Sequence, residues 1–333
     1  MRKAALGLAL AGLAFWPTAD ARAEADTLRA AKQFGLGYIQ LVIMEDQKLV
    51  EKHLAELGMP DVTVEWSTFR SSDVMNDALI SGNVDFVSLG PTGIVTIWDR
   101  TYGSYDVKVA AGLNGMAWLL NVRDPSINTI ADFKPDQRIA VPAVKVSGQA
   151  AALQMAAAKE WGDDQFERLD PLTVSISHPD ATAMMLGGPS EIVANFASPP
   201  FAQMQLKDPK IRTILTSDDI VGGPFPFNVI ATTASFREDN PTLYKAYLDA
   251  LNEATTMVNE DRDRALGIYL EATSDTNSKE DLIAIMEEST SHFTTDVLDL
   301  GAFTEFMGRT GRIDNVPDDW KAEMLFPEAK PAS

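Results

Sequence analysis

The chain has 333 residues, of which 45% are hydrophobic and 23% charged, and its formal net charge at pH 7 is −20. This length and composition fit one large globular domain or two medium ones, and exclude intrinsic disorder and a small disulfide scaffold. The acidic balance excludes wrapping of nucleic acid and docking on an anionic membrane, because both need clustered Lys and Arg.

The first 23 residues have the pattern of a signal peptide. Arg2 and Lys3 precede an apolar run over residues 4–15, and Ala21 and Ala23 supply a small-residue cleavage site. The apolar run is well short of the roughly 20 residues that a membrane-spanning helix needs. The chain has no cysteine, which excludes disulfides, thiol catalysis and a lipid-modified cysteine anchor. We therefore expect export, cleavage near Ala23 and a soluble protein in the periplasm.

From residue 28 the sequence alternates short β-type runs with helical runs, as in a mostly parallel sheet covered on both faces. The strands expected in this first unit are residues 28–34, 62–69, 84–89 and 107–113. The helices expected between them are residues 39–57, 73–80 and 91–102. Gly58 and Gly82 end the first two helices, and Pro91 opens the third.

The same order of strands and helices returns in a second unit. Its expected strands are residues 138–141, 172–176, 191–196 and 211–215, and residues 150–161 are expected to be helical. Extended runs at 116–122 and 225–232 link the two units. From Asn240 onward the pattern is helical, with Asn240 as the expected helix cap.

This pattern predicts an α/β fold with two doubly wound lobes joined by two hinge strands. Lobe one comprises residues 24–117 and 229–333, and lobe two comprises residues 118–228. The helical C-terminal part is expected to pack on lobe one.

Signatures of catalysis and of cofactor binding are scarce. The sequence has no Gly-x-Ser-x-Gly elbow, no His-Glu-x-x-His pair and no phosphate loop. Residues 35–40 resemble a dinucleotide loop, but Gln40 occupies the third glycine position. His53, His178 and His292 are not spaced as metal ligands. We expect no metal and no cofactor, and we expect His178 either to begin a helix or to face the cleft.

The predicted fold, rather than a catalytic or cofactor motif, indicates where the binding site lies. In an open parallel sheet, ligands bind beyond the carboxyl ends of the strands next to the point where the strand order reverses. In lobe two these ends lead into residues 142–149 and 197–200. In lobe one they are followed by Gly35, Tyr38, Gly90 and Thr92.

The strongest candidate for an anion site is the start of the helix after residue 147. Ser147 can cap this helix, and the free N–H groups of Gly148 and Gln149 could hold an oxyanion at the positive end of the helix dipole. No acidic residue occupies the first turn, and Lys145 is nearby. The alternative is an ordinary helix cap beside a surface lysine.

These segments resemble the nitrate/sulfonate/taurine family of periplasmic substrate-binding proteins. The motifs are Ile139-Ala140-Val141-Pro142 with Val146-Ser147-Gly148-Gln149, Ala78-Leu79 with Gly82-x-x-Asp85-Phe86, and Phe196-Ala197-Ser198-Pro199-Pro200. The resemblance implies a type II periplasmic-binding fold that closes on a small ligand without catalysis. It also implies a monomer that delivers this ligand to an ABC transporter permease with a cytoplasmic ATPase. The matching positions add Asn195, Phe196 and Ser198 to the candidate site.

The identity of the ligand stays open between two chemical classes. A sulfonate-, taurine- or nitrate-like anion fits the resemblance, but no arginine lies in the cleft loops apart from Arg70 at the end of a strand. Aromatic residues are plentiful in the predicted cleft and hinge segments, so a planar ligand such as a pyrimidine, flavin or aromatic acid is the alternative. An exported α/β enzyme is a third reading, which the missing catalytic motifs disfavour. The aromatic candidates are Phe34, Tyr38, Trp118, Phe196, Phe225 and Phe227.

Overall fold

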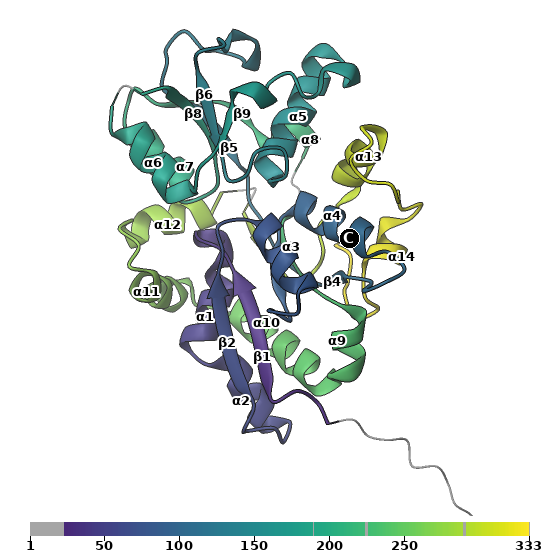
Figure 1. Cartoon of the computed structure of the whole chain (residues 1–333). Helices are drawn as coiled ribbons and strands as arrows, with labels where there is room; N and C mark the ends of the chain where they lie inside the picture. Colours follow the sequence, from purple (N-terminus) through teal and green to yellow (C-terminus); the bar gives the residue numbers. More distant parts are fainter. Residues whose placement is uncertain (1–22, 189, 224–225, 289–290, 333) are drawn as a thin grey trace, which may run out of the picture.

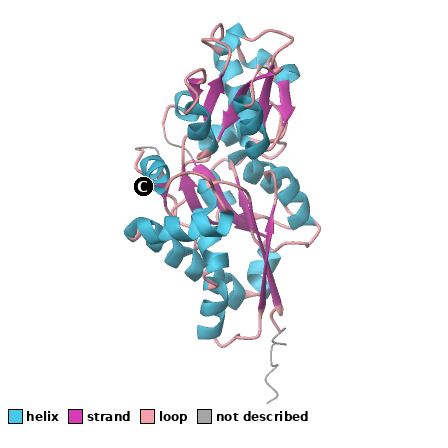
Figure 2. Cartoon of the chain, turned by 90° about the vertical axis from the view of Figure 1, so that its left-hand side faces the viewer, coloured by secondary structure: helices cyan, strands magenta, loops and turns pink. Residues whose placement is uncertain are grey.

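The structure is a computed structural model that describes residues 23–188, 190–223, 226–288 and 291–332. It shows two lobes, one above the other, each with a sheet flanked by helices (Figures 1 and 2). The expected signal peptide falls almost entirely on residues 1–22, outside the described residues. Within the described ranges, no helix is both long enough and apolar enough to span a membrane.

The sheet of lobe one joins segments from three parts of the chain. Four strands are ordered β11-β4-β10-β3, and β1 pairs in parallel with β2. A parallel bridge between Ala30 and Phe86 attaches the β1–β2 pair beside β3. The strands are β1 (Thr27–Lys32), β2 (Thr63–Thr68), β3 (Val87–Leu89), β4 (Lys108–Gly115), β10 (Pro226–Thr232) and β11 (His292–Phe293).

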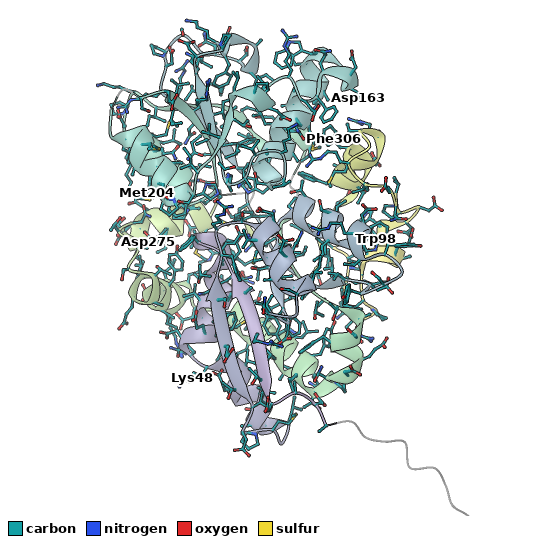
Figure 3. All side chains as sticks on the ribbon, viewed as in Figure 1. Lys48, Trp98, Asp163, Met204, Asp275 and Phe306 are labelled. Carbon is teal, nitrogen blue, oxygen red and sulfur yellow. The ribbon has the colours of Figure 1, made fainter. Side chains whose placement is uncertain are left out.

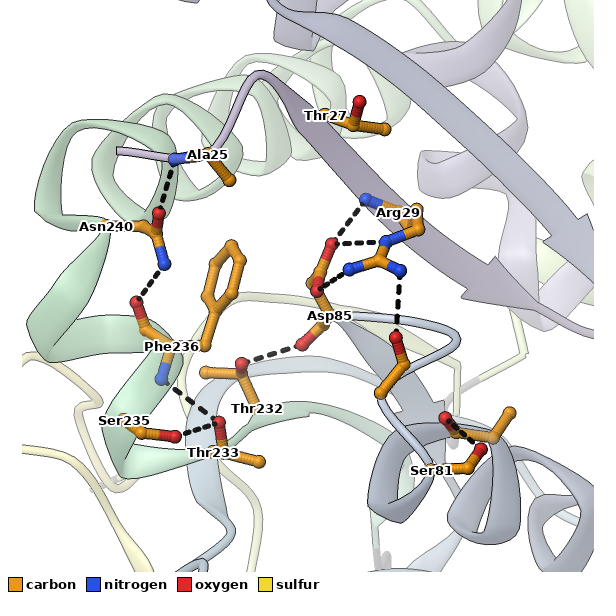
Figure 4. A network of polar contacts seen from close by, with 12 residues as sticks. Ala25, Thr27, Arg29, Ser81, Asp85, Thr232, Thr233, Ser235, Phe236 and Asn240 are labelled. Atoms are coloured by element: carbon orange, nitrogen blue, oxygen red, sulfur yellow. Dashed lines mark hydrogen bonds and ion pairs between the residues drawn. The ribbon is translucent and has the colours of Figure 1, made fainter. Parts of the chain in front are cut away.

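An ion pair strengthens this join between β1 and the β3 segment. The Arg29 guanidinium contacts both carboxylate oxygens of Asp85, at 3.0 and 3.2 Å (Figure 4). The Asp85 carboxylate also accepts from the Arg29 backbone N–H, and the Asp85 carbonyl accepts from the Thr232 hydroxyl on β10. One residue therefore ties three strand segments together.

Lobe two has a five-stranded sheet of order β7-β6-β8-β5-β9. Strand β6 pairs in parallel with β7 and β8, whereas β5 is antiparallel to both β8 and β9. In lobe one, β10 is likewise antiparallel to its neighbours β3 and β4. In both lobes the strand that follows a crossing from the other lobe is thus antiparallel to both of its neighbours. The strands are β5 (Leu119–Val122), β6 (Arg138–Val141), β7 (Thr173–Ser175), β8 (Ile192–Ala197) and β9 (Arg212–Thr216).

The helices between the lobe-one strands follow the predicted order with one correction. The helix expected over residues 39–57 is two helices, because Lys48 adopts a left-handed conformation with φ 50° and breaks the run. The helices are the 3₁₀ turn η1 (Leu36–Tyr38), α1 (Ile39–Asp46), α2 (Leu49–Glu56), α3 (Ser72–Ile80) and α4 (Pro91–Thr101).

Lobe two is centred on a helix rich in alanine. Helix α5 (Gly148–Trp161) buries every residue from Gly148 to Ala158, which lets it lie close to the sheet. The other α-helices are α6 (His178–Leu186), α7 (Phe201–Leu206) and α8 (Ser217–Val221), and short 3₁₀ turns cover 130–132, 163–165 and 170–172.

The C-terminal part of the chain is mainly helical and covers lobe one. Helix α10 packs against α1 and α2, and Tyr247 stacks on Phe86 with ring centroids 3.9 Å apart. The elements are α9 (Ala234–Asp239), α10 (Pro241–Glu260), α11 (Arg262–Thr273), α12 (Lys279–Met286), α13 (Gly301–Arg309) and α14 (Trp320–Met324).

The cap of α10 differs from the prediction. The Asn240 side chain does not cap this helix; its Oδ1 accepts from the Ala25 N–H at 2.8 Å (Figure 4). The Glu24 carboxylate instead accepts from the N–H groups of Thr242 and Leu243. A carboxylate is well suited to this role because the helix N-terminus carries partial positive charge.

The two expected hinge runs are largely strands of the sheets. Residues 119–122 form β5 and residues 226–232 form β10, so the described residues at the passages between the lobes are 116–118 and 222–223. Residue 225 of the second run lies outside the described residues. Rotation about these passages stays a prediction.

Candidate functional site

A small cavity lies where the two lobes face each other. Lobe one contributes Gln33, Phe34, Tyr38, Ser71, Ser72, Gly90, Phe227 and Asn228, and lobe two with its crossing contributes Trp118, Pro142, Ser147, Gly148, Gln149, His178 and Ser198. The space that a water-sized molecule can enter is about 30 Å³. That is room for a few waters, so the walls must move before a larger ligand enters.

Aromatic rings form the lobe-one side and the crossing. Phe227 lies edge-on to both Tyr38 and Trp118, at centroid distances of 6.1 and 5.7 Å. The Tyr38 hydroxyl donates to Asn228 Oδ1 at 3.1 Å, and burial raises its pKa, so the phenol stays protonated at neutral pH. Phe34 is 47% exposed and stands at the cavity edge.

The lobe-two side is built around the start of α5. The Ser147 hydroxyl accepts from the Ala150 N–H at 3.2 Å, and the first turn contains no acidic residue. Gly148 contacts the Trp118 ring so closely that a Cβ at this position would overlap it. The glycine therefore brings the helix N-terminus, with its partial positive charge, directly against the cavity wall.

His178 is a half-buried, neutral member of the cavity wall. Its ring stacks on Phe201, with centroids 5.7 Å apart and planes 17° apart. Its Nε2 lies 3.3 Å from the Gln149 amide nitrogen. Burial lowers the pKa of His178 to about 4, because removal from water disfavours the imidazolium.

Two buried polar atoms of the cavity residues have no hydrogen-bond partner among the described residues. They are Nδ1 of His178 in lobe two and Nδ2 of Asn228 in lobe one. A buried polar atom without a partner costs about 1–3 kcal/mol, and such atoms are uncommon in folded proteins. Their position in the cavity marks them as groups that a ligand could satisfy.

Most of the predicted site residues meet at this cavity. Those lining it are Phe34, Tyr38, Gly90, Trp118, Ser147, Gly148, Gln149 and Ser198. Gly35 and Thr92 lie beside it and connect the lobes. Gly35 faces the Pro199 carbonyl, and the Thr92 hydroxyl donates to the Val146 carbonyl at 3.1 Å.

Lys145, Asn195 and Phe196 do not line the cavity. The Lys145 ammonium bonds Glu167 at 3.0 Å and lies 3.6 Å from Asp170, so it adds no charge to the cavity. Phe196 is fully buried behind Trp118, at a centroid distance of 6.4 Å. Asn195 is 1% exposed on β8.

Several lining residues were not singled out from the sequence. Gln33 directly precedes Phe34, and Ser71 and Ser72 stand where β2 leads into α3, so the rule on strand ends could have found them. Asn228 lies within a predicted hinge run, where no sequence signal distinguishes it. Arg70 is exposed and is not among the lining residues, which include no arginine or lysine.

A larger hollow of about 620 Å³ lies on the outer side of lobe one, between α10, β4 and the C-terminal segment. Two of its cations are already paired: Arg237 with Glu328 and Lys245 with Asp249, each at 2.5 Å. It does not contain the facing groups of both lobes that define the interlobe cavity.

Comparisons with known proteins agree with this architecture. The NMT1-like family matches residues 23–268, so the chain belongs to that family. Among curated proteins, none matches the sequence significantly.

Solved structures of similar fold include three proteins that are named for the sulfonates or nitrate they bind. The alkanesulfonate-binding protein SsuA from Xanthomonas axonopodis pv. citri, bound to MOPS, has a TM-score of 0.70 at 16% identity, covering 93% of this chain and 100% of that one. The periplasmic aliphatic sulphonate binding protein SsuA from Escherichia coli has a TM-score of 0.65 at 18% identity, covering 91% and 98%. The periplasmic nitrate-binding protein NrtA from Synechocystis PCC 6803 has a TM-score of 0.57 at 16% identity, covering 78% and 69%. These likenesses confirm the two-lobed fold and the resemblance drawn from the sequence.

Proposed function

We propose that this chain is the periplasmic substrate-binding component of an ABC importer, which captures a small organic anion between its lobes. One observation carries the proposal: both lobes line a common cavity in which His178 Nδ1 and Asn228 Nδ2 are buried without protein partners. The fold shared with sulfonate- and nitrate-binding proteins supports the ligand class. The activity proposed is binding without turnover, followed by delivery to a permease.

The start of α5 is the proposed place for the anionic group. Ser147, Gly148 and Gln149 at this helix start line a cavity that has no carboxylate among its lining residues. The helix dipole supplies about half a positive charge at this end. In a protein of net charge −20, such a local feature is needed to hold an anion.

A planar, uncharged ligand is the second candidate, and two observations favour it. No arginine or lysine lines the cavity, and His178 is neutral above about pH 4. Phe34, Tyr38, Trp118 and Phe227 provide aromatic surface for stacking.

Ligand uptake in this proposal requires the lobes to separate. The cavity is too small for a multi-atom ligand as it stands, and in the described part of the chain the two lobes are linked covalently by the crossings that lead into β5 and β10. We propose rotation about these crossings, with the closed form presented to the permease.

Ser147→Asp tests the ligand class. The new carboxylate can still cap α5 but stands where an anion would bind, so the affinity for ethanesulfonate or nitrate should fall at least tenfold. Thr233→Asp is the matched control, because Thr233 caps α9 through the Phe236 N–H outside the cavity. Titration calorimetry with ethanesulfonate, nitrate and cytosine provides the readout.

The outcomes separate the two ligand classes. Unchanged anion affinity in Ser147→Asp overturns the anion site, and binding of cytosine by both variants supports the planar ligand. Conversion of any bound probe to a product would show an enzyme instead of a binding protein.

A further inference from the structure

The C-terminal strap, residues 301–315, contacts both lobes. On lobe one, Asp99 near the end of α4 accepts from the backbone N–H groups of Asp314 and Asn315, and from the Asn315 side chain. On lobe two, Phe306 lies edge-on to Phe166 at 6.0 Å, and Arg309 lies 3.3 Å from Asp163. Figure 3 shows Asp163 and Phe306 near each other where α13 approaches lobe two. The strap begins after residue 268, where the match to the NMT1-like family ends.

Arg312 makes two further polar contacts with lobe two, one of them to a buried side chain. Its guanidinium donates to Gln154 Oε1 at 2.6 Å and to the carbonyl of Lys145. Gln154 is 2% exposed and uses its amide nitrogen on both carboxylate oxygens of Asp170. Arg312 therefore satisfies the remaining polar atom of a buried glutamine.

The Lys145 carbonyl belongs to the loop that forms the lobe-two side of the cavity. Pro142, Ser147, Gly148 and Gln149 of this loop line the cavity. Lys145 itself has φ 66°, a left-handed conformation that is unfavourable for a residue with a side chain. Its carbonyl is held by Arg312 and its ammonium by Glu167, so contacts at both ends maintain the turn.

The strap thus connects the two helices whose first turns adjoin the cavity. Helix α4 begins after Gly90, and Asp99 on it anchors the strap. Helix α5 begins at Gly148, and Arg312 holds the loop before it and Gln154 within it. We propose that Arg312 is a positioning residue of the ligand site: it fixes the 142–149 loop and links it to lobe one through the strap. The effect on affinity rests on the proposed function, whereas the effect on the loop does not.

Arg312→Ala and Arg312→Lys test this role. Without ligand, hydrogen exchange of the amides in residues 143–151 should be at least tenfold faster in Arg312→Ala than in the wild type. Arg312→Lys, which keeps the charge but not the two-armed guanidinium, should be intermediate. The control is Arg309→Ala, which removes an exposed ion pair of the same strap and should leave this exchange unchanged.

The binding readout uses ethanesulfonate and cytosine. For whichever probe the wild type binds, Arg312→Ala should lower the affinity at least tenfold, and Arg312→Lys should restore part of it. Wild-type exchange rates and affinity in Arg312→Ala would overturn the proposal. If Arg312→Ala does not fold, Asp99→Ala replaces it, because this variant removes the contacts that hold the strap on lobe one. Wild-type exchange rates and affinity in both Asp99→Ala and Arg312→Lys would then overturn the proposal. If the wild type binds neither probe, the proposed ligand classes fail, while hydrogen exchange still decides the role of Arg312.

Discussion

The two lobes bring a glycine against an aromatic ring in the same way. In lobe one, Gly37 in the turn after β1 contacts Phe227 of β10; in lobe two, Gly148 after β6 contacts Trp118 before β5. Each ring lies at or next to the antiparallel strand that follows a crossing. In each lobe, the glycine turn between a strand and the following helix therefore packs against the chain segment that enters the lobe at a crossing.

The lobes differ in the polar groups that they add to this common frame. Lobe one provides Tyr38 and Asn228, which bond each other, and Ser71 and Ser72. Lobe two provides a helix N-terminus and His178, whose pKa is about 4. A shared topology thus fixes where the site lies, while residues at the strand ends decide what it binds.

The largest expected effect is a loss of stability in acid that distinguishes lobe two from lobe one, because the histidine that lines the cavity, His178, belongs to lobe two. Its pKa is about 4 in the folded protein against 6.5 in the unfolded chain, so the unfolded state binds more protons between these values. This group should therefore remove about 3 kcal/mol of stability as the pH falls from 7 to 4. Urea titrations at both pH values should show a loss of stability in acid that is larger in the wild type than in His178→Phe by about this amount. His292→Asn, at an exposed histidine, is the control, and an equal acid loss in all three proteins contradicts the prediction.

The next effect tests the equivalence of the two glycine contacts. Gly37→Ala and Gly148→Ala each place a methyl group against a ring, which should cost about 1–3 kcal/mol of unfolding free energy and weaken binding. Gly267→Ala within α11, where a Cβ meets nothing nearer than 4.0 Å, should be neutral or stabilising. Chemical denaturation of the three variants gives the comparison. A cost in one lobe without a cost in the other would show that the two contacts are not equivalent.

The smallest effect concerns helix caps. Helix α10 in lobe one is capped by Glu24 from the N-terminal segment, whereas α5 in lobe two is capped by the adjacent Ser147. Glu24→Ala and Ser147→Ala should each cost about 1 kcal/mol of unfolding free energy. Thermal unfolding at pH 7 measures both, and an unchanged midpoint for Glu24→Ala would show that its contact with α10 contributes nothing.

The fold was largely predictable because its strands and helices carry local signals. Residues 138–141 were predicted as a strand and form β6, since a short apolar run between turn residues leaves little choice. The break at Lys48 was not predictable, because a lysine in a left-handed conformation has no sequence signature.

The site was predictable where it follows from strand ends and not where it depends on distant contacts. Ser147 and Gly148 follow β6 directly and line the cavity as expected. The direction of the Lys145 side chain depends on Glu167 and Asp170, which belong to a separate part of lobe two. The contact between the strap and α5 depends on Arg312, which is more than 150 residues away from Gln154 in the sequence. No periodicity in the sequence reveals such a contact.

The position of Trp118 also means that the protein's intrinsic fluorescence can report on the lobes. The sequence has six tryptophans, and among the described residues Trp118 is the one that lines the interlobe cavity. Trp118 is 1% exposed and its ring lies edge-on to Phe227 of lobe one at 5.7 Å, so separation of the lobes would bring water to a ring that is now dry. Indole emission shifts to longer wavelength in polar surroundings, so opening and closing could be followed in real time by intrinsic fluorescence, without an attached dye.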